Sequence, residues 1–257
     1  MPTFSPISMS GSPQPRVTAR VAPENLHPAL WLASQLARVS GEAVDTGYPS
    51  LSAELPGGGW PLGGLIELLL PQAGIGELRL LRPALHSLAK RPIVLLQPPY
   101  MPQASAFEAL GVPSAQLLWL RSVHGKDALW AAEQVLRSGS CGVLLFWQNQ
   151  LRAEALRRLH LAAQAGNSLF CLLRPLAVAQ DASPALLRLA LRPAWLAKRV
   201  ALRIDILKRR GPSAAAPIFL QLQACPGLLH YDATLDRTSP AASRTGSVLP
   251  TLVGASS

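Results

Sequence analysis

The sequence predicts an α/β fold in which a mainly parallel sheet is covered by helices on both faces. Short runs of consecutive apolar residues alternate along the chain with amphipathic segments of helical length. Strands of a parallel sheet are buried on both faces, so they read as continuous apolar runs rather than as alternating ones. The clearest runs are residues 65–70, 93–96, 117–120, 142–147 and 169–173.

A second observation is the layout of residues 57–81, GGGWPLGGLIELLLPQAGIGELRLL. A glycine-rich approach leads into an apolar strand, then a glycine-containing loop at 71–76, then a leucine-rich segment that begins a helix. This strand, loop and helix order is typical of a phosphate-binding P-loop, in which backbone N–H groups and a helix N-terminus face an anion. The fold class is therefore that of a P-loop NTPase-type core.

The chemistry of such a loop is missing. A working loop reads G-x-x-x-x-G-K-[ST], where the lysine offsets phosphate charge and the hydroxyl holds Mg²⁺. Aligned without a gap, this chain has Leu70, Ile75, Gly76 and Glu77 at those four places. A shift of one residue makes Gly76 the second glycine but leaves Glu77 at the lysine position. We expect the degenerate loop, which also contains Gly74, to bind no nucleotide cofactor.

Catalytic groups are also absent where an open α/β sheet would place them, at the carboxyl ends of its strands. Gln97 follows the second strand, and Gln148 and Asn149 follow the strand at 142–147, so neither end carries an acid. The five histidines show no metal-ligand spacing. We therefore expect no active site, no metal and no enzymatic activity.

Composition points to a protein of the cytoplasm. Of the 257 residues, 49% are hydrophobic and 15% are charged, enough apolar material for a full-sized core. No apolar run reaches the about 18 to 20 residues of a membrane helix, and no signal peptide is evident. Cys141, Cys171 and Cys225 form no C-x-x-C pair, and their apolar surroundings predict buried, reduced thiols.

Other segments complete the expected organisation. Residues 1–24 are predicted to be a disordered lead, residues 25–231 the core, and residues 232–257 a disordered tail. Helices are expected from about Pro28, as one turn around Leu51 and Leu55, and at 104–110, 126–137 and 151–165. Pro83 should kink the helix after the loop or delay its start. Residues 200–207 and 218–222 alternate in polarity and predict an antiparallel hairpin at the sheet edge.

Positive charge is concentrated in one quarter of the chain. The net charge is +10, and residues 148–210 contain twelve Lys or Arg against three Asp or Glu. Such an excess is typical of a nucleic-acid surface or of a site for an acidic protein, although a solvated face explains it equally well. In the tail, Val248, Leu249, Leu252 and Val253 are a candidate docking motif, with an idle tail as the alternative.

The segment TG-x-P-x-L, followed by ELPGGGWP and IELLLP, resembles the ImuA family, RecA-like and SulA-like accessory proteins of bacterial translesion DNA synthesis. The resemblance covers residues 27–222, and Ser52 departs from it where RecA-like relatives often have Asp. It implies a RecA-like core without recombinase catalysis and an adaptor role in the SOS response to DNA damage. It also implies two partners, an ImuB-like inactive polymerase homologue and an error-prone DnaE-type polymerase. RecA and single-stranded DNA are further candidates.

In RecA-like proteins the stretches after the fourth and fifth core strands lie near single-stranded DNA. By this resemblance the nucleic-acid candidates are Arg152, Arg157, Arg158, Arg174, Arg188 and Arg192, and the basic quarter adds Lys208, Arg209 and Arg210 as nucleic-acid or partner candidates. Aromatic side chains that could stack on bases are scarce in these stretches, so contact with a protein competes with contact to DNA.

Two alternatives stay open. A SulA-like division inhibitor that binds the tubulin-like FtsZ would share the same degenerate core. A residual NTPase with unusual ligands is the third hypothesis.

Overall fold

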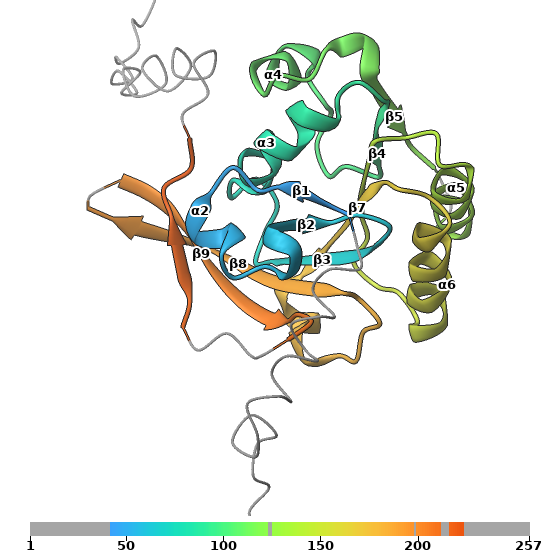
Figure 1. Cartoon of the computed structure of the whole chain (residues 1–257). Helices are drawn as coiled ribbons and strands as arrows, with labels where there is room; N and C mark the ends of the chain where they lie inside the picture. Colours follow the sequence, from blue (N-terminus) through green and yellow to red (C-terminus); the bar gives the residue numbers. More distant parts are fainter. Residues whose placement is uncertain (1–41, 123–124, 198, 212–215, 224–257) are drawn as a thin grey trace, which may run out of the picture. The chain divides into compact units, whose positions relative to one another are not determined.

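The structure is a computed structural model that describes residues 42–122, 125–197, 199–211 and 216–223. The predicted lead at 1–24, the helix expected from Pro28, Cys225 and the tail candidates Val248, Leu249, Leu252 and Val253 lie outside these residues. The described part is a mixed α/β unit built on a mostly parallel sheet (Figure 1).

Eight strands form the main sheet in the order β10-β9-β8-β3-β7-β6-β4-β5. Six strands, from β8 to β5 in that order, are parallel, and β9 and β10 are antiparallel to their neighbours. The strands are β3 (Gly64–Leu70), β4 (Ile93–Leu96), β5 (Leu117–Leu120), β6 (Val143–Trp147), β7 (Leu169–Pro175), β8 (Leu187–Leu196), β9 (Arg199–Lys208) and β10 (Ile218–Leu220).

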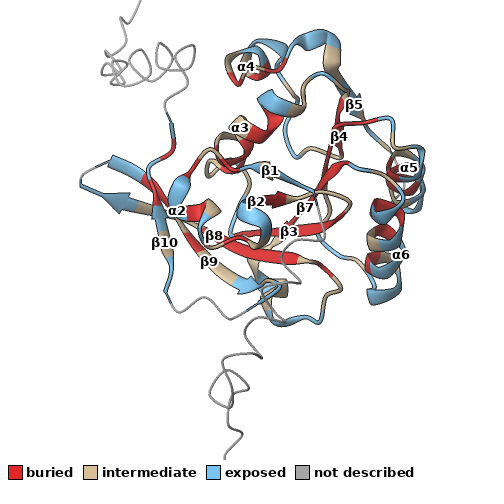
Figure 2. Cartoon of the chain, viewed as in Figure 1, coloured by how far each residue is buried: buried red, intermediate tan, exposed pale blue. Residues whose placement is uncertain are grey.

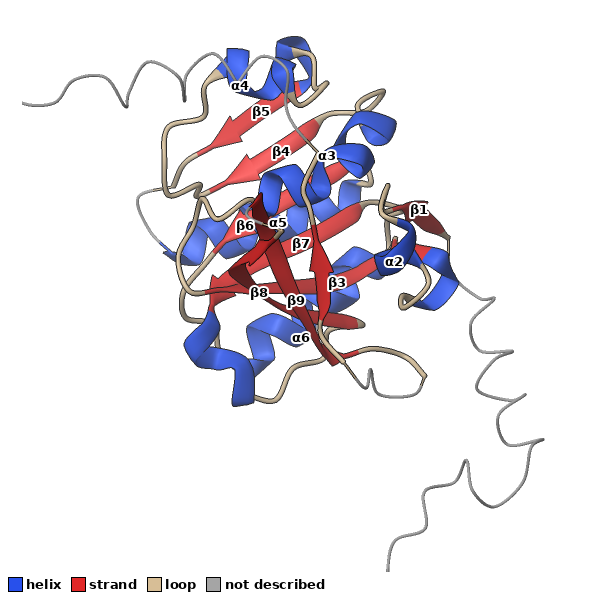
Figure 3. Cartoon of the chain, turned by 90° about the vertical axis from the view of Figure 1, so that its left-hand side faces the viewer, coloured by secondary structure: helices blue, strands red, loops and turns tan. Residues whose placement is uncertain are grey.

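Helices cover both faces of the sheet, as the sequence predicts (Figure 3). Helices α3 (Glu77–Leu88) and α4 (Ala104–Ala109) pack on one face through Leu80, Leu81 and Phe107. Helices α5 (Gly125–Ser138) and α6 (Ala153–Gln164) pack on the other face through Leu136 and Leu159. Two buried apolar clusters therefore enclose the central strands, which are buried along most of their length (Figure 2).

The C-terminal edge differs in part from the expectation. The predicted antiparallel pairing of β9 with β10 is confirmed. Strand β8 was not expected, yet it pairs in parallel with β3 and antiparallel with β9. Leu187, Leu189 and Leu191 face the apolar cluster that packs against α3 and α4, while Arg188 and Arg192 lie on the other face of the strand. The sequence carries this alternation of apolar and polar positions, but Arg188, Arg192 and Pro193 make it difficult to recognise as a buried strand.

A small antiparallel sheet of β1 (Ala43–Asp45) and β2 (Gly59–Pro61) precedes β3. Between its strands lie the expected helical turn, α2 (Pro49–Ser52), and the 3₁₀ turn η2 (Pro56–Gly58). Gly59 is required where the strands meet, because a Cβ there would lie 2.3 Å from the Val44 carbonyl oxygen. Trp60 on β2 is fully buried, so this small sheet is part of the core.

Helix α3 runs from Glu77 through Pro83 to Leu88, so of the two expected effects of Pro83 the delayed start is wrong, and the kink stays a prediction. Pro83 has no N–H to donate to the Arg79 carbonyl four residues earlier. The Tyr48 hydroxyl donates to that carbonyl instead, at 3.3 Å. Gly47, at φ 74°, lets the chain pass close to the proline ring, since a Cβ there would lie 2.4 Å from Pro83 Cγ. The TG-x-P segment thus compensates for the proline in α3.

Candidate functional site

The glycine loop at 71–76 joins β3 to α3 at the carboxyl ends of the parallel strands. Gly74 and Gly76 have φ of 88° and 115°, in the left-handed region that favours glycine. In this conformation consecutive backbone N–H groups can converge on an anion.

The carboxylate of Glu77 accepts hydrogen bonds from these N–H groups. Its Oε1 is 2.8 Å from the Gly74 nitrogen, and its Oε2 is 3.1 Å from the Gly76 nitrogen. The Glu77 residue is 3% exposed and begins α3, where a negative charge interacts favourably with the helix dipole. The loop therefore binds an anion that belongs to the chain itself, and the N–H groups of Gly74 and Gly76 are not free for phosphate.

A pocket of about 530 Å³ lies beside the loop at the strand ends. Carboxamides line it, including Gln97, Gln148 and Asn149, at the places where an NTPase would need carboxylates. Gln97 has φ 54°, unusual for a residue with a side chain, and its Nε2 donates to the Ser122 carbonyl at 2.7 Å. Among the described residues that line this pocket, Arg174 alone is charged. Neutral amides at the strand ends offer no general acid or base.

Two of the predicted basic candidates are buried, which corrects their interpretation as nucleic-acid contacts. Arg174 and Arg188 flank the fully buried Glu67, with nitrogen to oxygen distances of 2.9 and 2.5 Å. Arg188 also donates to the carbonyls of Val178, Ala179 and Asp181. Both arginines lie in the interior of the sheet. Their cationic groups can be buried there because the Glu67 carboxylate pairs with both of them.

The other candidates divide between two regions. Arg152, Arg157 and Arg158 are exposed at the start of α6, as predicted. On the C-terminal strands Arg192 pairs with Asp205, Lys208 donates to the Ser183 carbonyl, Arg209 pairs with Glu54, and Arg210 is exposed. The nine basic residues therefore do not form one surface.

The α6 arginines have a neighbour that the sequence reasoning missed. Trp130 on α5 lines the same pocket as Arg152 and Arg158, and it is 64% exposed. Its exposure is readable from the sequence, because the buried positions Ala128, Ala132 and Leu136 repeat every four residues and Trp130 is out of phase with them.

Other titratable groups offer no reactive centre. Burial raises the pKa of the Cys171 thiol, and burial also raises that of Cys141 despite its contact with Ser168. Both thiols are free and buried, which confirms the prediction for these two. Burial, aided by Lys208 and Arg210, lowers the pKa of His160.

In the described ranges, no cluster of three or more His, Cys, Asp or Glu could hold a metal ion. No helix among these residues combines the length and the apolar character that a membrane crossing requires.

No family model matches this chain. Over 76 residues it is 40% identical to the cell division inhibitor SulA of Edwardsiella piscicida, covering 30% of this chain and 45% of that protein. Over 100 residues it is 32% identical to the cell division inhibitor SulA of Yersinia pestis, covering 38% of this chain and 60% of that protein. The chain thus spans about half the length of the curated relatives it matches.

A crystal structure of SulA from Pseudomonas aeruginosa aligns with a TM-score of 0.37 at 25% identity, covering 43% of this chain and 97% of that one. The sequence matches support a SulA-like relationship over part of the chain, and the resemblance to the ImuA family stays a prediction.

Proposed function

We propose that this chain is a non-catalytic, SulA-like protein of the cytoplasm that acts in the SOS response by binding another protein. The partner we propose first is the division protein FtsZ. The observation that carries the proposal is the sequence similarity to two proteins named as cell division inhibitors. The occupation of the loop by Glu77 supports the non-catalytic part, because a bound triphosphate would meet a carboxylate instead of a lysine.

Expression of the chain in its host tests the division proposal. Cells should become filamentous, and the purified chain should block assembly of purified FtsZ in a sedimentation assay. Leu80→Asp is a suitable control, because it buries a charge in the core and should abolish both effects. Normal division together with normal FtsZ assembly would remove this candidate.

A second candidate is the translesion adaptor, acting with an ImuB-like protein and a DnaE-type polymerase. Its support is that the segments carrying the ImuA resemblance are built into the fold, as the Gly47–Pro83 contact and buried Trp60 show. More than half of the chain also lies outside each of the two SulA matches. Deletion of the gene should then abolish damage-induced mutagenesis while the partner genes remain intact, and unchanged mutagenesis would exclude it. RecA and single-stranded DNA would be additional partners of this adaptor.

A further inference from the structure

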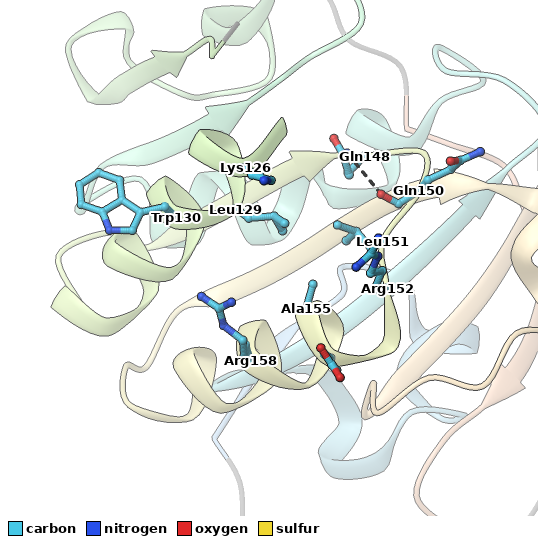
Figure 4. Close-up of a pocket in the computed structure, with 10 residues that line it drawn as sticks. Lys126, Leu129, Trp130, Gln148, Gln150, Leu151, Arg152, Ala155 and Arg158 are labelled. Carbon is cyan, nitrogen blue, oxygen red and sulfur yellow. Dashed lines mark hydrogen bonds between the residues drawn. The ribbon is translucent and has the colours of Figure 1, made fainter. Parts of the chain in front are cut away.

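A pocket of about 760 Å³ lies between α5 and α6, and Gln148 lines both it and the pocket beside the glycine loop. We call it the α5–α6 groove. Lys126, Leu129 and Trp130 contribute from α5, and the opposite wall comes from the end of β6 and the start of α6 (Figure 4). That wall consists of Gln148, Gln150, Leu151, Arg152, Glu154, Ala155 and Arg158.

The groove combines an apolar base with a large exposed aromatic side chain. Leu129, Leu151 and Ala155 are half-buried, while Trp130 is 64% exposed. Trp and Arg are the residue types that most often dominate the energy of protein–protein interfaces, where they are desolvated by the partner. Trp130 is therefore suited to cover an apolar side chain of another protein.

Positive charge borders this apolar base. Lys126, Arg152 and Arg158 line the groove against a single acid, Glu154. Arg158 extends from α6 toward α5, where it pairs with the buried Glu133 at 2.8 Å (Figure 4). This ion pair holds the guanidinium in place before any partner arrives, which lowers the entropy cost of binding.

From this arrangement we infer that the α5–α6 groove binds an acidic segment of the protein partner, one large apolar side chain flanked by carboxylates. The apolar residue packs against Trp130 and Leu151, and the carboxylates pair with Lys126 and Arg152. A nucleic-acid strand fits less well, because Trp130 is the one aromatic side chain among the described lining residues, whereas successive bases need several stacking surfaces, and the apolar base pairs with no phosphate. The inference rests on the proposed function and assigns it a surface.

Two exposed substitutions test the groove, Trp130→Ala and Arg152→Glu. Trp195→Ala and Arg210→Glu are matched controls, since they remove an exposed Trp on β8 and reverse an exposed Arg just after β9, and neither residue lines the groove. Affinity for purified FtsZ, and separately for the ImuB-like protein, is measured by titration after far-UV circular dichroism shows that each variant is folded. For whichever protein binds, each groove variant should lose at least about tenfold in affinity, and the controls should stay within about twofold. Affinity of the intact chain should also fall as salt is raised.

The outcomes separate the inference from the proposed function. Binding by the intact chain that survives both groove substitutions would overturn the groove and leave the function standing. Equal losses in the controls would do the same. Absence of binding to both proteins would overturn the groove together with the function. Direct binding of an oligothymidylate to the intact chain, lost in Arg152→Glu, together with its displacement of the bound protein from the intact chain, would replace the acidic segment with nucleic acid.

Discussion

The carboxylate of Glu77 accepts hydrogen bonds from two N–H groups of the glycine loop at 71–76. We predict that Glu77→Ala lowers the free energy of unfolding by about 1.5 to 3 kcal/mol, because two hydrogen bonds to a charged acceptor are lost. Glu77→Gln keeps one oxygen acceptor and should lose less. Urea unfolding measures both, with the exposed Glu108→Ala as a control expected within about 0.5 kcal/mol of the parent. Parent-like stability of Glu77→Ala would contradict the role given to this carboxylate.

The same substitution exposes the loop N–H groups to external anions. Inorganic phosphate at millimolar concentration should raise the thermal midpoint of Glu77→Ala but leave the parent unchanged, because only in the variant are the Gly74 and Gly76 N–H groups released from the carboxylate. ATP added to the parent should give neither heat in a calorimetric titration nor hydrolysis. Either signal would restore the residual NTPase hypothesis.

His160 makes stability depend on pH in a defined direction. Its Nδ1 accepts a hydrogen bond from the Leu65 N–H at 3.3 Å, which requires that nitrogen to be unprotonated. Burial lowers the pKa of His160 in the folded state, so the unfolded chain binds the proton more readily. The stabilisation of the folded state by neutral His160 should be complete above its pKa in the unfolded chain, about 6.5. It should be lost as the pH falls from there toward the lowered pKa of His160 in the folded state.

The measurement is the unfolding free energy between pH 7.5 and pH 5.5, compared between the parent and His160→Gln. The parent should lose more stability over this interval, since Gln does not titrate. Parallel curves for the two proteins would remove His160 as a source of the dependence.

At the scale of elements, the TG-x-P segment and helix α3 depend on each other. Tyr48→Phe should cost about 1 kcal/mol, because the Arg79 carbonyl then loses the donor that replaces the missing N–H of Pro83. In a Pro83→Ala background the helix supplies its own N–H, and the same tyrosine substitution should cost much less. A double-mutant cycle in urea measures this coupling. Additive losses would show that the hydroxyl does not act through Arg79.

Strands β3, β7 and β8 are joined by the buried Glu67 and its two arginines. Glu67→Ala should destabilise the fold by about 3 to 5 kcal/mol, because it leaves two cationic groups buried without their carboxylate. Arg192→Ala, which removes a half-exposed ion pair on the same β8 strand, should cost at most about 1 kcal/mol. Similar losses for the two variants would mean that burial does not distinguish these ion pairs.

How far the sequence predicts these elements depends on the kind of signal each one carries. The strands at Ile93–Leu96 and Leu117–Leu120 were predicted to the residue, and the other continuous apolar strands within a residue or two. Parallel strands buried on both faces need such runs, although β5 at the sheet edge has the run with Leu118 and Trp119 exposed. Strand β8 was not predicted, because in the sequence Arg188 resembles an exposed residue. Only the structure shows that it pairs with the buried Glu67. The pairing of β1 with β2 was not predicted, because the strands are short and their pairing depends on contacts such as that of Gly59 with Val44.

At the scale of the whole molecule, the twelve basic residues at 148–210 overstate the basic surface. Arg174 and Arg188 are buried with Glu67, and Arg192 and Arg209 are paired with acids, whereas Arg152, Arg157, Arg158 and Arg210 are exposed. Composition revealed the excess of charge, but only the fold shows which part of it can meet a partner. The α5–α6 groove was not predictable, since it joins Trp130 with residues some twenty positions later in the chain.

The location of the groove leads to a last prediction, which sets the core against the tail. If the partner binds between α5 and α6, removal of residues 232–257 should leave its affinity within about twofold of the intact chain, because the proposed contacts all come from residues 126–158. Titration of the truncated chain with FtsZ, and with the ImuB-like protein, provides the measurement. A matched control replaces Val248, Leu249, Leu252 and Val253 with Ser in the full-length chain. If truncation and the serine variant both abolish binding while Trp130→Ala does not, the tail motif is the docking site. If Trp130→Ala alone abolishes it, the partner binds the core.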